Sequence, residues 1–141
     1  MQKTSTGETV IVPRNFKLLE ELERSEKGLG EMAISYGLVD PGDTFMTEWN
    51  GGILAYDGRF FELRITCTDE YPAAPPKVRF VSRINMTCVD QTTGEVIQSK
   101  LTALRHWNRN SSIEQVLLAL RAEMYSEANR RLRQPPDGTT F

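Results

Sequence analysis

The sequence has little cysteine and almost no histidine. Among its 141 residues are two cysteines, Cys67 and Cys88, and one histidine, His106. Two cysteines indicate free thiols in a reducing compartment more than a disulfide framework, with a single bridge between them as the alternative. One histidine and no Cys/His cluster leave no ligand set at zinc spacing. We therefore expect no metal and no other cofactor.

The sequence also lacks a long apolar run and a strong charge of either sign. No segment approaches the roughly 20 apolar residues that cross a bilayer, and residues 1–10 have neither the basic nor the apolar part of a signal peptide. The formal net charge is -2, from 17 basic and 19 acidic residues. This balance gives no global field toward nucleic acid or anionic lipid. We expect a cytoplasmic and nuclear protein whose partners are proteins, with no nucleic acid and no membrane among them.

What is present is the composition of one globular domain. Hydrophobic residues make up 39% of the chain and charged residues 26%, which is typical of soluble domains. A chain of this length can bury a single stable core. Residues 1–11 are polar and predict a flexible leader, and residues 12–141 predict the domain itself.

Two helices are expected, one near each end of the domain. Pro13 suits the first turn of the first helix, which Gly28 and Gly30 end. A capping box from Ser111 to Glu114 opens the second helix. Its apolar stripe has the spacing of an amphipathic helix and consists of Ile113, Val116, Leu117, Leu120 and Met124.

The segments between the helices predict strands. Four extended segments are expected, at residues 32–40, 44–56, 60–68 and 77–84. Asp57-Gly58 is a hairpin turn signal, and alternation in the third segment places Cys67 in the core as an inert thiol. Residues 85–110 have no sustained period. The whole order predicts an α+β fold with a four-stranded antiparallel meander covered on one face.

Several features allow two interpretations from periodicity alone. Phe16 points away from the leucine arc of its helix, so it either packs at the core edge or under the leader, or is an exposed anchor for a partner. Ser35 lies on a strand face of small residues, which is either a neutral solvent face or room for another protein. Gly51-Gly52 marks a bulge or a close backbone approach. Phe60 falls on the polar side of its strand, as a solitary aromatic or as part of a docking patch.

A series of motifs resembles the ubiquitin-conjugating (UBC) fold in order and spacing over about residues 12 to 125. Its members are Tyr71-Pro72, Pro75-Pro76, Val78, Phe80, Ile84, Gly94, Trp107 and Ser112-Ile113. Residues 12–23 and 132–141 resemble the opening and closing segments of the ubiquitin-conjugating enzyme variants (UEVs), which partner an active conjugating enzyme. The resemblance implies the UBC fold without the last helices of active members.

The residues that carry catalysis in active members are missing. Such members have a His-Pro-Asn tripeptide after the fourth strand, and this position reads Met86-Thr87-Cys88. The cysteine that receives ubiquitin as a thioester is replaced by Ile97. Loss of one oxyanion donor alone commonly costs about two to three orders of magnitude in rate. We expect a catalytically inactive subunit. The acids Asp90 and Glu95 are expected to raise the pKa of a Cys88 thiol.

The resemblance implies two partners. An active ubiquitin-conjugating enzyme is expected to bind as a heterodimer through Val12, Pro13, Arg14, Asn15 and Phe16. Acceptor ubiquitin is expected to bind noncovalently at Ser35, Gly52 and Phe60. The heterodimer would then build lysine-sixty-three-linked chains. The turn at residues 55–59 is shorter than the loop of relatives, so contacts of that loop do not transfer.

Two other functions are compatible with parts of the pattern. A UEV domain that recognises short proline-containing peptides in membrane sorting shares the fold and the missing cysteine, but is not expected to carry the segments at residues 12–23 and 132–141. A cryptic conjugating enzyme would use Cys88 as a displaced nucleophile.

Overall fold

The computed structural model describes residues 13–28 and 32–141. The expected leader at residues 1–11, together with Val12 and Gly30, lies outside the described residues. The elements in chain order are α1 (Arg14–Glu26), β1 (Ile34–Leu38), β2 (Glu48–Leu54), β3 (Phe60–Thr66), β4 (Lys77–Phe80), the 3-10 turn η1 (Gln98–Lys100), α2 (Thr102–Arg105), α3 (Ile113–Glu123) and α4 (Glu127–Arg130).

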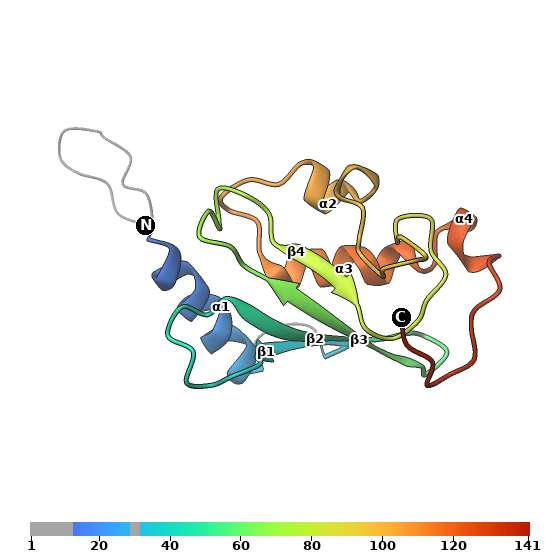
Figure 1. Cartoon of the computed structure of the whole chain (residues 1–141), viewed down its shortest axis with the longest axis horizontal. Helices are drawn as coiled ribbons and strands as arrows, with labels where there is room; N and C mark the ends of the chain where they lie inside the picture. Colours follow the sequence, from blue (N-terminus) through green and yellow to red (C-terminus); the bar gives the residue numbers. More distant parts are fainter. Residues whose placement is uncertain (1–12, 29–31) are drawn as a thin grey trace.

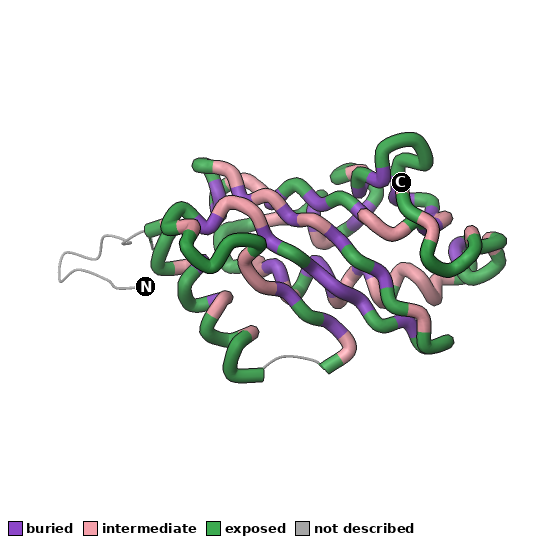
Figure 2. The backbone as a smooth tube through the Cα atoms, turned by 60° about the horizontal axis from the view of Figure 1, so that its bottom comes forward, coloured by how far each residue is buried: buried purple, intermediate pink, exposed green. Residues whose placement is uncertain are grey.

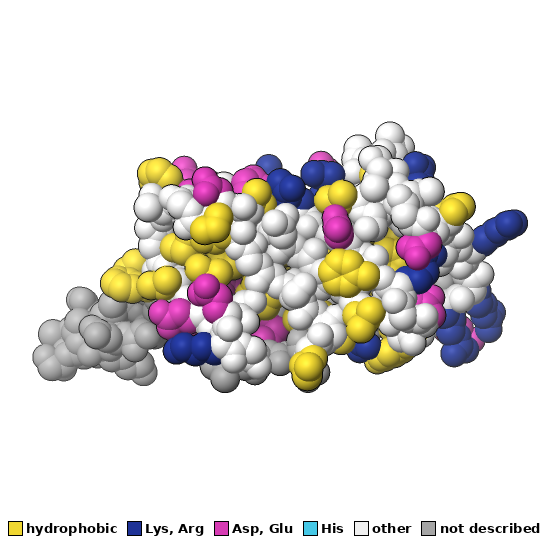
Figure 3. All heavy atoms as spheres, turned by 90° about the horizontal axis from the view of Figure 1, so that it is seen from below, with side chains coloured by type: hydrophobic (Ala, Val, Ile, Leu, Met, Phe, Trp, Pro, Cys, Tyr) yellow, Lys and Arg dark blue, Asp and Glu magenta, His cyan; other side chains and the backbone are white. Residues whose placement is uncertain are grey.

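The four strands form one antiparallel sheet in the order β1-β2-β3-β4, which confirms the predicted meander. The helix α3 crosses one face of the sheet, and α1 lies beside β1 at one end (Figure 1). Buried and exposed residues alternate along the strands (Figure 2). The other face of the sheet is open and is seen from below in Figure 3.

The core lies between the sheet and α3. Trp49, Phe80 and Leu117 are among its largest fully buried side chains. Cys67 is fully buried as predicted, and burial raises the pKa of its thiol. Both cysteines are free, so the alternative of a bridge between them is wrong.

The glycine pair in β2 marks a close backbone approach and not a bulge. Strand pairing continues through both residues without an inserted position. A Cβ on Gly51 would lie 3.0 Å from Ile65 Cδ1 and 3.5 Å from a methyl of Leu117. Gly51 therefore leaves room on the inner face for the Ile65 side chain of β3, while a Cβ there would be in ordinary contact with Leu117 of α3.

The capping box lies one residue later than predicted. The hydroxyl of Ser112 accepts from the backbone N–H of Gln115, and the Gln115 side chain accepts from the backbone N–H of Ser112. Glu114 is used elsewhere, in a 2.9 Å ion pair with Arg24 of α1. The prediction of Ser111 with Glu114 was therefore wrong, because the helix begins one residue later, with Ser112 as its N-cap and Gln115 at the third helical position.

Two short helices were not predicted. α2 interrupts the segment at residues 85–110, and α4 follows α3 before the tail at residues 132–141. Each has four residues, too few to show a hydrophobic period. Among the described residues, no helix is long and apolar enough to cross a bilayer.

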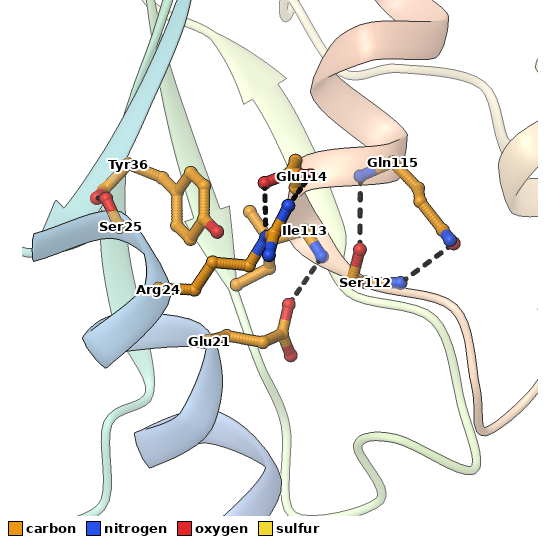
Figure 4. A network of polar contacts seen from close by, with 8 residues as sticks. All are labelled: Glu21, Arg24, Ser25, Tyr36, Ser112, Ile113, Glu114 and Gln115. Atoms are coloured by element: carbon orange, nitrogen blue, oxygen red, sulfur yellow. Dashed lines mark hydrogen bonds and ion pairs between the residues drawn. The ribbon is translucent and has the colours of Figure 1, made fainter. Parts of the chain in front are cut away.

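A buried carboxylate joins α1 to α3. Glu21 is 6% exposed; its Oε1 accepts from the backbone N–H of Ile113 at 2.7 Å, and its Oε2 accepts from the hydroxyl of Tyr71. Figure 4 shows Glu21 pointing at the start of α3, with Arg24 reaching Glu114 one turn along. The bond to Ile113 satisfies one of the backbone donors that every helix start leaves unpaired. Burial raises the pKa of Glu21 above its ordinary value.

Replacement of Glu21 by alanine is expected to lower the free energy of unfolding by about 2 kcal/mol, because it leaves the Ile113 N–H and the Tyr71 hydroxyl buried without a partner. Urea denaturation at pH 7 measures this value. Glu20→Ala is the matched control, since Glu20 is exposed on the same helix and its loss should change the free energy by less than about 0.5 kcal/mol.

The stabilisation by Glu21 is also expected to depend on pH in a definite direction. Because the folded state raises the pKa of Glu21 above 4.5, the folded protein holds the proton to higher pH than the unfolded chain does. The free energy of unfolding that Glu21 contributes therefore falls as the pH rises from the pKa of the unfolded chain to the higher pKa of the folded protein. The gap between wild type and Glu21→Ala should widen as pH is lowered from 7 toward 4.5. A gap that is constant or narrows contradicts the buried role of Glu21.

Candidate functional site

The structure brings together the two positions that the resemblance assigns to catalysis. The backbone N–H of Ile97 donates to the carbonyl of Cys88 at 2.7 Å, and Val89 pairs with Val96 in an isolated bridge. Met86 is buried and Thr87 is exposed. Ile97 is thus held beside the segment of residues 86–88 by backbone pairing, and its side chain cannot form a thioester.

The thiol of Cys88 lies in this segment but is poorly suited to chemistry. Cys88 is 1% exposed, and burial, with a smaller effect from the carboxylate of Glu123, raises its pKa to about 11. The rise was predicted, but its assignment to Asp90 and Glu95 was wrong. The larger cause is removal of the thiol from water. The sequence did not indicate this burial, because residues 85–110 have no sustained hydrophobic period.

The tail at residues 132–141 is hydrogen-bonded to the residue just before the tripeptide position. The backbone N–H of Asn85 donates to Gln134 Oε1 at 2.9 Å, and Gln134 Nε2 donates back to the carbonyl of Asn85 at 2.9 Å. The side-chain amide of Asn85 donates to the carbonyl of Arg133. Asn85 is therefore engaged by the tail through its backbone and its side chain.

An exposed apolar surface surrounds the start of α1. Phe16 is 66% exposed and Phe45 is 70% exposed. Leu19, three residues after Phe16 on the same helix face, is 44% exposed. In Figure 3 hydrophobic side chains gather at the end of the molecule where α1 begins, and Lys and Arg side chains gather at the opposite end. We call Phe16, Leu19 and Phe45 the α1 surface.

The exposure of Phe16 excludes one of the interpretations that its helix period allowed. Packing at the edge of the core is wrong, because most of the side chain is accessible. Packing under the leader lies outside the described residues, as does Val12. Pro13 and Asn15 are exposed beside Phe16, so three of the five residues predicted for the partner interface are exposed together.

Arg14, the remaining member of that group, bonds within the molecule. Its guanidinium donates to the carbonyls of Cys67 at 2.7 Å and Thr68 at 2.9 Å, after β3, and to the carbonyl of Phe45, before β2. These bonds fix the first turn of α1 against two loops. Arg14 therefore fixes the first turn of α1, which carries Phe16, next to the backbone of Phe45, a role that spacing in the sequence could not show.

The residues predicted for acceptor ubiquitin also lie together, on the open face of the sheet. Ser35 pairs with Gly52 in the β1–β2 register, and Gly52 lies beside the ring of Phe60. A shallow hollow of about 500 Å³ runs along this face, with Ser35, Phe60, Glu62 and Arg64 among its lining residues. Gly52 itself is buried. The accessible part of this group consists of Ser35 and the half-exposed ring of Phe60.

Sequence reasoning missed Leu19 and Phe45 as members of the α1 surface. Phe45 follows the turn Asp40-Pro41-Gly42-Asp43, and a large aromatic residue beside a polar turn was the available signal. Leu19 was placed on the leucine arc of the helix, where only Leu18 is fully buried. Its exposure follows from how α1 lies against β1, which the helix period does not determine.

The burial of Cys88 predicts an unreactive thiol. With a pKa of about 11, about one thiol in a thousand is ionised at pH 8, and only the thiolate reacts. Iodoacetamide should therefore modify Cys88 in the folded protein at least about 100-fold more slowly than in the chain unfolded with guanidinium. Peptide mass spectrometry separates Cys88 from Cys67. Equal rates in the folded and unfolded protein contradict this account.

Comparison with known proteins agrees with this geometry. The family model described as ubiquitin-conjugating enzyme matches residues 18–135. Human ubiquitin-conjugating enzyme E2 G1 superposes with a TM-score of 0.69 at 26% sequence identity, covering 83% of this chain and 99% of the human chain.

Two curated relatives are similar over nearly their whole length. Ubiquitin-conjugating enzyme variant MMS2 of Saccharomyces cerevisiae is 52% identical, over 92% of this chain and 98% of the relative. Ubiquitin-conjugating enzyme E2 variant 1C of Arabidopsis thaliana is 48% identical, over 96% of this chain and 97% of the relative. These matches show that the chain belongs to the ubiquitin-conjugating enzyme family and, within it, to the enzyme variants.

Proposed function

We propose that this chain is a catalytically inactive subunit that binds an active ubiquitin-conjugating enzyme through the α1 surface. On the open face of its sheet it holds acceptor ubiquitin noncovalently. The heterodimer then makes lysine-sixty-three-linked chains. One observation carries the proposal. A chain with the fold of a conjugating enzyme has Ile97 at the expected nucleophile position and exposes two separate surfaces, the α1 surface and the open face of the sheet.

The α1 surface has the character of a protein interface. Exposed aromatic side chains are the residues whose burial contributes most to association. Phe16 and Phe45 come from distant parts of the chain, and the guanidinium of Arg14 bonds to the backbone that carries one of them. A surface held in this way loses little conformational freedom on binding, which favours affinity.

The chemistry in this proposal occurs on the partner. Donor ubiquitin is attached there as a thioester, and the lysine amine of acceptor ubiquitin attacks its carbonyl carbon. An isopeptide bond forms, the C–S bond breaks, the amine releases one proton to water, and the partner's cysteine leaves as the thiolate. The present chain supplies position, because holding the acceptor converts a bimolecular encounter into a nearly unimolecular step worth up to about 7 to 11 kcal/mol.

The two alternatives have less support. A cryptic enzyme needs an accessible thiolate, whereas Cys88 is 1% exposed and its pKa is raised to about 11. A peptide-binding variant of membrane sorting does not account for the exposed α1 surface. The relatives named as variants match this chain from near one end to near the other.

Phe16→Ala is expected to abolish heterodimer formation, because it removes one of the two exposed aromatic side chains of the α1 surface; a loss of at least about 100-fold in affinity is expected. Isothermal titration calorimetry with an active ubiquitin-conjugating enzyme measures it. Phe60→Ala is the matched control, since it removes an exposed phenylalanine from the open sheet face. If Phe16→Ala binds like wild type, the proposed partner site is wrong.

Ser35→Arg is expected to block chain growth while the heterodimer still forms, because a long cationic side chain fills the hollow where the acceptor binds. The rate of ubiquitin chain synthesis in a reconstituted reaction should fall at least about tenfold. Ser99→Arg adds the same side chain at an exposed position of η1 and serves as the control. Normal chain synthesis by Ser35→Arg excludes this face as the acceptor site.

A further inference from the structure

Gly52 lies between the other two residues of the predicted acceptor site. On β2 it pairs with Ser35 of β1 on one side and with Glu62 of β3 on the other. Phe60 belongs to the neighbouring row, where it pairs with Leu54. Its ring reaches diagonally across the sheet to Gly52, a distance that aromatic side chains can span.

The space above Gly52 is already filled. A Cβ built on Gly52 would lie 2.3 Å from Cζ and 2.8 Å from Cε1 of Phe60, and 2.7 Å from Oγ of Ser35. Real Cβ atoms essentially never approach a heavy atom closer than 3.0 Å. Any side chain at position 52 would therefore push the Phe60 ring and the Ser35 hydroxyl apart.

The need for glycine here is steric and not conformational. Gly52 has no positive φ, in contrast to Gly58 in the hairpin turn. Its backbone lies in a regular strand, where a glycine ordinarily weakens the sheet. Glycine at position 52 leaves room on the outer face of the sheet, and the Phe60 ring lies there against the backbone. Aromatic rings are placed over glycine in the same way to stabilise designed sheets.

We propose that Gly52 is a positioning residue for acceptor ubiquitin: it forms the floor on which the Phe60 ring lies, so that the ring and Ser35 form one continuous contact surface. This inference rests on the proposed function. The ring of Phe60 is 51% exposed, so one part of it is anchored and another part is available. The partner that fits presents an apolar patch to the ring and hydrogen-bonding groups to the polar side chains around it, Ser35, Asn50, Glu62 and Arg64.

A double-mutant cycle tests the role of Gly52. Four full-length proteins are compared by titrating ubiquitin into the isotope-labelled chain and following amide shifts by NMR: wild type, Gly52→Ala, Phe60→Ala and the double variant. Each single substitution should weaken ubiquitin binding about tenfold. The double variant should bind no more weakly than Phe60→Ala alone, because Gly52 acts only through the ring.

Two further readouts separate positioning from a general effect on folding. Wild type should show a nuclear Overhauser contact between the Phe60 ring and the Gly52 α-protons, and Gly52→Ala should lose the contact of the ring with position 52. Gly37→Ala is the control, since a Cβ there meets no atom within 4 Å on the same face; it should leave the ring signals unchanged. If Gly52→Ala folds poorly, removal of the ring in the double variant should restore the unfolding temperature.

The outcomes are distinguishable. Wild-type binding of ubiquitin by Gly52→Ala, or losses that add to about 100-fold in the double variant, overturns the positioning role and leaves the proposed function intact. If the wild-type chain itself binds no ubiquitin, the acceptor part of the proposed function fails and this inference fails with it.

Discussion

The carboxylate of Glu21 is the contact on which the arrangement of the helices depends. It accepts from the first backbone N–H of α3 and from the hydroxyl of Tyr71, in the proline-containing connection after β3. Three segments far apart in sequence therefore meet at one buried group. Removing a carboxylate from water is costly, and burial raises its pKa. Two hydrogen bonds to the ionised group offset that cost.

The direction of α1 follows from two fixed points. Glu21 and the neighbouring pair Arg24–Glu114 hold the helix against the start of α3. Arg14, about two turns earlier, holds its first turn against the loops that end β3 and precede β2. Phe16 lies between these points and faces solvent. Phe16 is thus exposed on a helix that is fixed at two points, which suits the partner contact that we propose for it.

Local patterns predicted most of the fold. The meander, the Asp57-Gly58 hairpin, the buried Cys67 and the apolar stripe of α3 depend on spacing and turn chemistry, which neighbouring residues determine. The exceptions depend on contacts between distant residues. Glu114 forms an ion pair with Arg24 of α1 and is not part of the capping box. Glu21 is buried, although a glutamate on a helix is ordinarily a surface residue.

The candidate site divides in the same way. The family resemblance named Phe16, Ser35, Gly52 and Phe60, and the structure shows them exposed or in contact as two separate groups. The intramolecular bonds of Arg14 and the burial of Gly52 under a ring were not predictable, because both require the three-dimensional position of a side chain from another strand or loop. The sequence suggested Gly52 as a contact residue, whereas in the structure Gly52 is buried and lies beneath the ring of Phe60.

The central claim is that the chain contributes position and no chemistry. The most direct test is reconstitution of ubiquitin-activating enzyme, ATP, ubiquitin and an active conjugating enzyme, with and without this chain, followed by mass spectrometry of the linkages formed. The account predicts that lysine-sixty-three-linked chains form rapidly only when both subunits are present, and that this chain itself never carries a thioester. Equal amounts of these chains without the subunit, or a ubiquitin thioester on Cys88, would contradict it.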